Sequence, residues 1–230
     1  MNIFIKVVIA ILLLKNSFVF AQIPEIKTDA SGVKFYEEAR FKKGEINKPF
    51  YYIRHGETDV NKHNIAPENL DVSLNEEGKA QAQEAVKVLR DKNIKIIVAS
   101  PLIRTKQTAE IISKELNVPI LYDDGLKELN IGYVKGENMK LSKKNEIWKS
   151  GGEVAGAESL YLFQERIHKT IKEVVNKYDD VLIVSHAGYF SQLSILLNED
   201  KLKTKNAIPF FFSPISRNTG KELYKITPLM

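Results

Sequence analysis

The chain has 230 residues, and its 43% hydrophobic and 27% charged residues, with 12 Gly and 8 Pro, are typical of one globular domain and exclude disordered, collagen-like and coiled-coil proteins. The absence of cysteine excludes disulfide frameworks, thiolate metal sites and cysteine nucleophiles. The formal net charge of +5 comes from 34 basic and 29 acidic residues, which indicates a mixed solvated surface, so nucleic acid is not an expected partner.

The first segment, residues 1–21, has the pattern of an export signal. A basic start at Met1–Lys6 precedes the apolar run Val7–Leu14, and Val19–Ala21 ends in a small residue that suits a signal peptidase. We expect cleavage after this segment, an exported protein that is periplasmic or secreted, and no stable membrane insertion. The apolar run is shorter than the roughly 20 residues that span a bilayer. An uncleaved anchor is the alternative, because Phe18–Phe20 extend the run.

The next segment, residues 22–49, mixes charges with scattered apolar residues, and we interpret it as an N-terminal leader that wraps a domain of residues 50–230. The hydrophobic pattern then predicts, in chain order, a strand at Phe50–Ile53, a helix at Asn75–Asp91, a strand at Ile96–Ala99, a helix at Ile103–Leu116, a long helix from Leu160 to Tyr178 and a strand at Val181–Val184. Continuous apolar strands that alternate with amphipathic helices predict an α/β fold. We expect a three-layer sandwich with a mostly parallel central sheet and helices on both faces.

Two further segments have an expected structure. The polar, Lys-rich stretch of residues 132–156 is predicted as a short lid insertion over one end of the sheet, with a solvated loop as the alternative. Its lysines at 135, 140, 143 and 144 would favour polyanionic substrates if they face the site. Phe210–Phe212 is predicted as a final core strand, and an exposed patch that joins two copies into a homodimer is the alternative.

Histidines and arginines follow three of the predicted strands at the points where the strands end. Arg54-His55 follows the first strand, Ser100 to Arg104 follows the second, and Ser185-His186 follows the last. Ligands of open α/β sheets bind beyond the carboxyl ends of strands, so we expect these side chains to converge. Guanidinium groups and helix N-termini suit a dianionic phosphate. No carboxylate cluster has metal-ligand spacing, so neither a metal nor another cofactor is expected.

Over residues 50–197 the sequence resembles branch 1 of the histidine phosphatase superfamily, the branch of phosphoglycerate mutases and small phosphatases. Six motifs in the family's order carry the resemblance: Arg54-His55-Gly56-Glu57-Thr58 with Asn61, Leu74-Asn75-x-x-Gly78, Ser100-Pro101-Leu102-x-Arg104-x-x-Gln107-Thr108-Ala109, Leu126-x-Glu128-x-x-x-Gly132 with Gly136, Gly156-Ala157-Glu158-Ser159, and Val184-Ser185-His186-Ala187-Gly188. The resemblance implies a phosphoglycerate mutase-like fold and a small phosphorylated substrate.

The resemblance also implies roles for the residues in these motifs. His55 would be the nucleophile, attacking phosphorus as neutral imidazole to form a phosphohistidine. Arg54, Arg104 and a cationic His186 would surround the transferring phosphoryl group and stabilise the charge on its oxygens. Glu128 would protonate the leaving group and then accept a proton from the attacking water.

The roles expected of other polar residues near these motifs are less specific. Thr58 and Asn61 would add neutral hydrogen bonds to the substrate. Glu158 and Asp123 are the competitors of Glu128 for the acid role. The two remaining histidines are expected to be solvated bystanders, His168 on the surface of the long helix and His63 with an alternative contact to substrate.

The chain departs from the family pattern at residues 65–71, where many members carry a Gln-Gly element, so the substrate does not follow from the resemblance. The interval between Glu128 and His186 is short for a phosphoglycerate mutase, and export separates the chain from glycolytic pools. Both features favour an exported, metal-independent phosphatase of phosphomonoesters, whose phosphohistidine water can reach. The alternatives are a mutase-type phosphotransferase and a noncatalytic protein that binds a phosphorylated ligand.

Overall fold

The computed structural model describes residues 26–28, 34–36, 39–63, 71–130, 156–198, 201–215 and 223–230. Six strands form the central sheet in the order β5-β4-β6-β3-β7-β8. In chain order they are β3 (Phe50–Arg54), β4 (Ile96–Ala99), β5 (Ile120–Tyr122), β6 (Val181–Ser185), β7 (Pro209–Ile215) and β8 (Leu223–Pro228). β1 (Ile26–Thr28) and β2 (Lys34–Tyr36) form a separate antiparallel pair. The helices are α2 (Asp59–Lys62), α3 (Glu76–Leu89), α4 (Ile103–Leu116), α6 (Leu160–Lys177) and α7 (Ala187–Asn198), with a 3-10 turn η3 (Asp124–Leu126).

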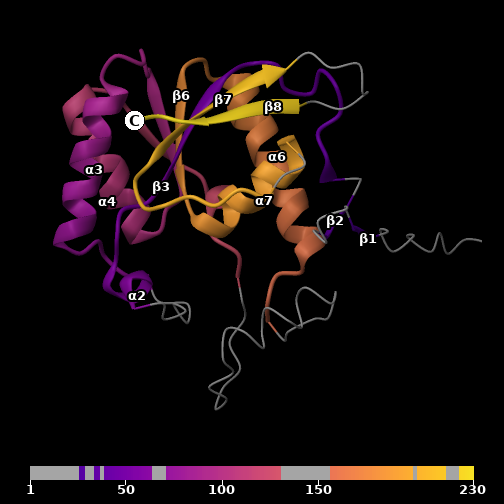
Figure 1. The fold of residues 1–230 in the computed structure, drawn as a ribbon, viewed down its shortest axis with the longest axis horizontal. Coiled ribbons are helices and arrows are strands. Elements are labelled where there is room, and N and C mark those ends of the chain that lie inside the picture. The colour runs from indigo at the N-terminus through magenta and orange to yellow at the C-terminus, as the bar shows by residue number, and fades with distance from the viewer. Residues whose placement is uncertain are drawn as a thin grey trace, which may run out of the picture.

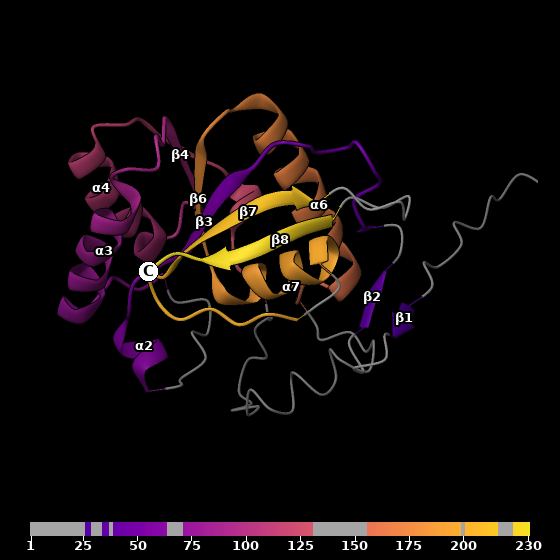
Figure 2. The same ribbon diagram turned by 45° about the horizontal axis from the view of Figure 1, so that its top comes forward.

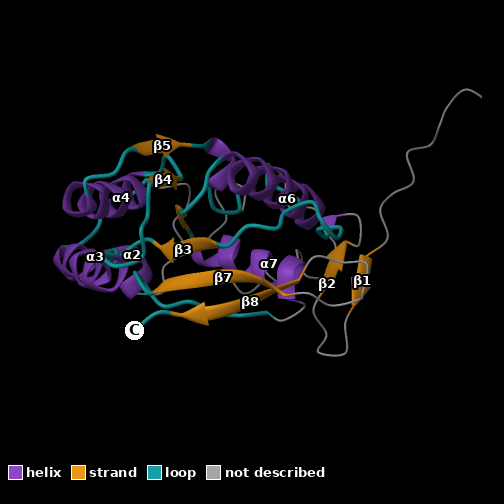
Figure 3. Cartoon of the chain, turned by 90° about the horizontal axis from the view of Figure 1, so that it is seen from above, coloured by secondary structure: helices purple, strands orange, loops and turns teal. Residues whose placement is uncertain are grey.

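The helices cover both faces of the sheet. Helices α3 and α4 lie on one side and α6 and α7 on the other, as Figures 1 and 3 show. The fully buried strand β6 explains this arrangement, because its side chains alternate between the faces. Val181 and Ile183 join the core under α6 and α7, whereas Leu182 and Val184 join the core under α3 and α4. A strand buried on both faces is continuously apolar, which is the pattern from which the sandwich was predicted.

The sheet is parallel in its first half and antiparallel in its second. β5, β4, β6 and β3 pair in parallel, and β7 and β8 then add antiparallel partners beside β3. The predicted final strand at Phe210–Phe212 lies within β7, where Phe210 and Phe212 are buried, so the exposed-patch alternative fails for these two rings. Figure 2 shows β8 at the edge of the sheet with α7 behind it. The three-layer α/β sandwich predicted from the sequence is therefore confirmed.

Local sequence signals determine where the predicted helices begin and end. Asn75 caps α3 by accepting a hydrogen bond from Gly78 N at 2.8 Å, and α3 ends at Leu89, two residues before the predicted end. Helix α4 has the predicted bounds and stops at Asn117, whose left-handed backbone (φ 54°) closes the helix. Helix α7 was not predicted, because most of its residues are buried on all sides and its sequence has no amphipathic period. The short elements α2, β5 and β8 were also missed.

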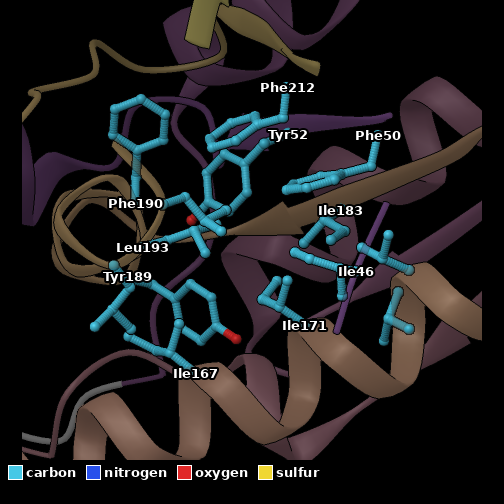
Figure 4. Packing of buried hydrophobic residues seen from close by; sticks show 14 of the residues in the cluster. Ile46, Phe50, Tyr52, Ile167, Ile171, Ile183, Tyr189, Phe190, Leu193 and Phe212 are labelled. Carbon is cyan, nitrogen blue, oxygen red and sulfur yellow. The ribbon is translucent and has the colours of Figure 1, made fainter. Parts of the chain in front are cut away.

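The larger part of the core is aromatic and lies between the sheet and helices α6 and α7 (Figure 4). Phe50 stacks on Phe212 with ring centroids 4.6 Å apart, and the ring of Tyr52 lies 5.3 Å from that of Phe190 on α7. Each such side chain contributes about 1.5–3 kcal/mol of burial free energy. Because Tyr52 is also hydrogen-bonded to the backbone of His186, this core extends directly to the site described below.

Part of the segment predicted as a leader is buried in the core of the domain that was expected to begin at residue 50. Ala39, Phe41 and Ile46 are fully buried in the same cluster as Phe50. The segment gave no signal of burial because three buried apolar residues within eight positions have neither a helical nor a strand period. The domain therefore begins no later than Ala39.

The same segment is tied to α6 by a charged cluster around Glu45. Its carboxylate accepts hydrogen bonds from Lys172 Nζ at 2.8 Å and lies 2.9 Å from His168 Nε2. His168 is therefore half-buried and also packs edge-on against Phe41, which corrects the expectation that it is a solvated bystander. Burial alone would raise the pKa of Glu45, but the hydrogen bonds from Lys172, the backbone of Lys42 and His168 outweigh it and hold the pKa at about 2.

Replacing Glu45 by glutamine is expected to lower the free energy of unfolding at pH 7 by about 1–2 kcal/mol, allowing for solvent screening. Because the pKa of Glu45 is below its ordinary 4.5 in the fold, its contribution is fully present above that pH and is lost as the pH falls towards 2. Urea unfolding of both proteins at pH 7 and pH 3 measures the effect, with the exposed Glu173→Gln as control. A difference that stays constant between the two pH values would contradict this prediction.

Some sequence-based expectations fall on other parts of the chain. The export signal at residues 1–21, the loop at residues 65–70 and the lid, apart from Gly156, lie outside the described residues. Within the described ranges, no helix has both the length and the apolar composition that crossing a membrane requires.

Candidate active site

The two predicted catalytic histidines follow neighbouring parallel strands. Arg54 at the end of β3 is paired in register with Ser185 at the end of β6, so His55 and His186 come next on the two chains. Their ring centroids are 5.4 Å apart with planes inclined at 63°. Strand β4 lies on the other side of β6, and the helix that follows it carries Arg104 in its first turn. The topology therefore brings the four side chains to one edge of the sheet.

The hydrogen bond of His55 determines which ring nitrogen is reactive. Its Nδ1 lies 2.7 Å from the carbonyl oxygen of Gly56, which can only accept, so Nδ1 carries the proton and Nε2 keeps its lone pair. Burial lowers the pKa of His55 well below its usual range, and the charges of Arg104 and Arg54 lower it further. The neutral imidazole that a nucleophile requires is therefore the stable form.

The surroundings of His186 within the protein favour the neutral form of its ring, whereas a cation was expected. Burial lowers its pKa well below the usual range, and Arg104, His55 and Arg54 act in the same direction. Its Nε2 lies 2.9 Å from the hydroxyl of Ser100. The sequence indicated that His186 lies at the phosphate-binding position. It did not indicate the free-energy cost of placing a third cation in a buried cluster that already contains two arginines.

The backbone of His186 is held by Tyr52. The Tyr52 hydroxyl donates to the His186 carbonyl oxygen at 2.7 Å and accepts from the His186 N–H at 3.1 Å. Tyr52 lies on β3, three residues before His55. The aromatic core thus fixes the position of one histidine relative to the strand that carries the other.

The two arginines supply the positive charge of the site. Burial lowers the pKa of both Arg54 and Arg104, while the carboxylate of Glu128 raises it. An arginine remains protonated under such shifts, so two guanidinium cations face the same region. Arg54 is anchored by a 3.3 Å hydrogen bond from Nη1 to the carbonyl oxygen of Thr204.

Three residues of the site have a buried nitrogen atom with no hydrogen-bond partner among the described residues: Arg54 Nε, Asn61 Nδ2 and His186 Nδ1. Buried polar atoms in folded proteins nearly always have a partner, and exceptions call for an explanation. These atoms come from three separate segments of the chain. Their common explanation is a polar ligand that accepts hydrogen bonds, such as a phosphoryl group.

Thr58 and Asn61 form the first turn of α2. The Asn61 Oδ1 accepts from Thr58 N at 2.8 Å, and the Thr58 hydroxyl accepts from Asn61 N at 3.2 Å, which is a capping box. The Thr58 hydroxyl is therefore used inside the protein and buried. Of the two residues predicted to bind substrate, Asn61 keeps an amide nitrogen for a ligand. Thr58 orients the Asn61 side chain through the hydrogen bonds of the capping box.

Glu128 lies at the N-terminus of α7, next to His186. Its carboxylate accepts hydrogen bonds from Gly188 N at 3.0 Å, Tyr189 N at 3.1 Å and Leu129 N at 3.0 Å. A Cβ at Gly188 would lie only 2.6 Å from Glu128 Oε1, so glycine is needed for this approach. These backbone N–H donors fix the position of the Glu128 carboxylate at the start of α7.

The two competing carboxylates have other partners. Glu158 forms a two-pronged ion pair with Arg166 at 2.8 and 2.7 Å. Asp123 caps η3 by accepting a hydrogen bond from Gly125 N at 2.7 Å. The charge of Glu128 raises the pKa of both Arg54 and Arg104, so this carboxylate lies close to both arginines. The geometry therefore favours Glu128 as the acid of the site.

Two glycines let the loop of the first motif cross the start of α3. A Cβ on Gly56 would overlap the carbonyl oxygen of Gly78, and a Cβ on Gly78 would overlap that of Glu57. The Gly56 N–H also donates to the Thr108 hydroxyl on α4 at 3.1 Å. Both glycines are in the quoted motifs, and the structure shows that the close crossing of two backbones requires them.

Several residues that shape the site were not predicted. Asn206 donates from Nδ2 to the His55 carbonyl oxygen at 3.0 Å, from a loop far along the chain that carried no recognisable signal. Ser100 was quoted in a motif without a role. His63, as expected, is exposed, at the end of α2. Arg166, whose contacts are described below, gave no signal beyond a polar position in a helix.

Comparison with known proteins agrees with this arrangement. The family model of the histidine phosphatase superfamily (branch 1) matches residues 50–211. The uncharacterized phosphatase PhoE of Bacillus subtilis is 35% identical over 138 residues, which are 59% of this chain and 70% of that protein. The probable phosphoglycerate mutase GpmB of Escherichia fergusonii is 31% identical over 146 residues, which are 59% of this chain and 68% of that protein.

Solved structures share the fold. A mycobacterial glucosyl-3-phosphoglycerate phosphatase in complex with VO3 superposes with a TM-score of 0.65 at 23% identity, covering 78% of this chain and 97% of that one. A putative alpha-ribazole-5'-P phosphatase of Escherichia coli superposes with a TM-score of 0.64 at 19% identity, covering 79% and 96%. The family match over most of the chain, on a sheet that brings both histidines and both arginines together, leads to one conclusion: the chain belongs to branch 1 of the histidine phosphatase superfamily.

Proposed function

We propose that this protein is a metal-independent phosphatase that hydrolyses phosphomonoesters through a phosphohistidine on His55. The observation that carries the proposal is the His55 imidazole, which is neutral, protonated on Nδ1 and buried between two guanidinium cations and His186. A site that only bound phosphate would gain nothing from a nucleophilic nitrogen held in this tautomer. The relatives that are named phosphatases support the proposal.

The reaction takes place in two displacements at phosphorus. In the first, His55 Nε2 forms a bond to phosphorus, the bond to the ester oxygen breaks, and Glu128 gives its proton to the leaving oxygen. In the second, water attacks phosphorus while Glu128 takes up a proton, the bond between nitrogen and phosphorus breaks, and inorganic phosphate leaves. Glu128 and His55 are thus regenerated in each cycle.

The remaining polar groups stabilise the transferring phosphoryl group. Its three equatorial oxygens carry the charge in the transition state. Arg54 Nε, Asn61 Nδ2 and His186 Nδ1 lack a partner in the part of the chain that the structure describes, and we assign them to these oxygens together with the Arg104 guanidinium. Donors held in place before the substrate arrives need no reorganisation during the reaction, which is the main electrostatic source of rate acceleration.

The test is phosphate release from p-nitrophenyl phosphate by the purified protein in buffer with EDTA. We expect turnover that EDTA does not reduce. Loss of activity in EDTA would refute metal independence, and absence of phosphate release from a panel of monoesters would refute the phosphatase proposal. The His55→Ala protein, discussed below, provides the blank for contaminating phosphatases.

A phosphoglycerate mutase is the second candidate, because the relative GpmB is named a probable mutase. A mutase transfers the phosphoryl group from histidine back to a hydroxyl group of its substrate, whereas a phosphatase transfers it to water. Incubation with 3-phosphoglycerate separates the two reactions. Isomerisation without release of inorganic phosphate would favour the mutase.

The activity is expected to persist under mildly acidic conditions. Because burial and then the two arginines lower the pKa of His55, the nucleophile stays neutral well below pH 6.5. We expect kcat/KM on p-nitrophenyl phosphate, whose leaving group needs little help from an acid, to stay within about threefold between pH 7.5 and 5.5 after correction for ionisation of the substrate. On alkyl phosphates, whose leaving oxygen needs the proton of Glu128, a mildly acidic optimum is expected. A pH–rate profile at constant ionic strength measures this. A decline with a midpoint near 6.5 would indicate an ordinary histidine and contradict the prediction.

We also propose that the protein acts outside the cytoplasm, on the basis of the charged and apolar pattern of residues 1–21. Expression of the full chain followed by cell fractionation and N-terminal sequencing tests this. A mature protein that begins at Gln22 is expected. An intact N-terminus in the membrane fraction would support the anchor instead, and an intact N-terminus in the cytoplasm would refute export.

A further inference from the structure

Arg166 on helix α6 uses all of its hydrogen-bond donors. Nε and Nη2 bind the two oxygens of Glu158 at 2.8 and 2.7 Å. Nη1 donates to the carbonyl oxygens of Gly125 and Lys127, both at 2.8 Å, and Nη2 makes a longer contact of 3.5 Å to the carbonyl oxygen of Glu128. A guanidinium group has five N–H donors in a fixed plane, and here five acceptors occupy them.

The backbone that Arg166 binds leads directly to the acid of the proposed reaction. Residues 125–128 run from η3 into a segment without regular structure. The carbonyl oxygen of Leu126, between those bound by Arg166, accepts a hydrogen bond from the Ser185 hydroxyl at 2.8 Å. Every carbonyl oxygen from residue 125 to residue 128 therefore binds a side chain from α6 or β6. These contacts restrict the backbone conformation of residues 125–128.

This conformation places the Glu128 carboxylate at the N-terminus of α7. Its hydrogen bonds to Gly188 N and Tyr189 N require the Glu128 backbone to stay at a fixed distance from that helix. Neither helix is connected to the loop by a short stretch of chain, so side-chain contacts must hold the three segments together. Arg166 makes the contacts on the side of α6, and the ring of Phe163 supports its guanidinium at 4.9 Å.

We propose that Arg166, held by Glu158, is a positioning residue that keeps Glu128 where it protonates the leaving group. The proposal rests on the phosphatase function proposed above. Arg166 acts through Glu128 and contributes to the step in which the leaving oxygen takes up a proton. Its loss therefore has a signature that general damage to the fold does not have, namely a dependence on the leaving group.

The test compares two substrates of the purified protein and its Arg166→Lys variant. p-Nitrophenolate leaves without much help from an acid, whereas the alkoxide of glycerol phosphate must be protonated as it leaves. kcat/KM reports the first displacement, so later hydrolysis of the phosphohistidine does not obscure the comparison. We expect kcat/KM to fall about 10- to 100-fold on glycerol phosphate and less than about threefold on p-nitrophenyl phosphate.

Four further proteins complete the design. Glu128→Gln defines the full loss of the acid, and the double variant with Arg166→Lys is expected to lose no more than Glu128→Gln alone, because both changes affect one function. Arg90→Lys is the matched control, because Arg90 is exposed and pairs with Glu115 away from the site. If Arg166→Lys does not fold, Glu158→Gln is used instead. This variant weakens the ion pair that holds Arg166 while leaving the arginine in place.

Equal losses on both substrates, or additive losses in the double variant, would overturn the positioning role of Arg166. Unchanged activity on both substrates would overturn it as well. Absence of hydrolysis by the unmodified protein is a different result, because it refutes the phosphatase proposal and the role of Arg166 with it.

Discussion

Replacing His55 by alanine is expected to lower kcat by at least about 10⁴-fold on any phosphomonoester that the protein hydrolyses. The variant loses the nitrogen that forms the bond to phosphorus. The second histidine is not expected to substitute for it, because its Nε2 is engaged with the Ser100 hydroxyl and its Nδ1 is assigned as a hydrogen-bond donor to a phosphoryl oxygen. The remaining arginines still bind phosphate, so KM is expected to change much less than kcat.

Trapping of the covalent intermediate makes this result specific. A phosphohistidine is stable in base and labile in acid, so rapid quenching with labelled substrate is expected to leave label on the unmodified protein and none on His55→Ala. His63→Ala is the matched control, because His63 follows the same motif but is exposed. A His55→Ala protein that keeps more than about 1% of the activity would show that the nucleophile lies elsewhere.

Replacing Arg104 by lysine is expected to lower kcat/KM by about 10²- to 10³-fold. The side chain is 5% exposed, at the start of α4, and its planar fork faces the same region as Arg54 and the two histidines. Lysine keeps one positive charge but cannot bind two phosphoryl oxygens with a rigid pair of donors. The loss is expected in kcat more than in KM, since charge on these oxygens grows in the transition state.

Arg104→Ala gives a second, independent readout. The charge of Arg104 lowers the pKa of both His55 and His186, so its removal is expected to raise the pKa of the nucleophile. A raised pKa means that protonation inactivates His55 at a higher pH, and the acidic limb of the pH–rate profile moves upward. Lys106→Ala on the same helix is the control, because Lys106 lies over the ring of Tyr122. An unshifted profile would indicate that Arg104 does not act on His55.

Local patterns in the sequence determined the elements that position the site. The apolar runs that became β3, β4 and β6 and the helix signals at Asn75 and Asn117 depend on neighbours within a few residues, and the structure has them close to where they were predicted. The ends of these strands then located His55, Arg104 and His186, since parallel strands finish at the same edge. Assignment of roles to these residues came from the resemblance to a family.

Other properties depend on segments that are far apart in the chain. Packing between elements leaves no periodic trace in the sequence. It accounts for the burial of Phe41 and Ile46, for the lack of an amphipathic period in α7, and for the hydrogen bonds from Arg166 to residues 125–128. The lowered pKa of His186 has the same origin, because the free energy of a buried cation depends on every charge around it. The sequence by itself determined which chemical groups reach the edge of the sheet. Only the tertiary structure decided the pKa values of these groups and their hydrogen-bond partners, because desolvation and long-range contacts exist only once the chain has folded.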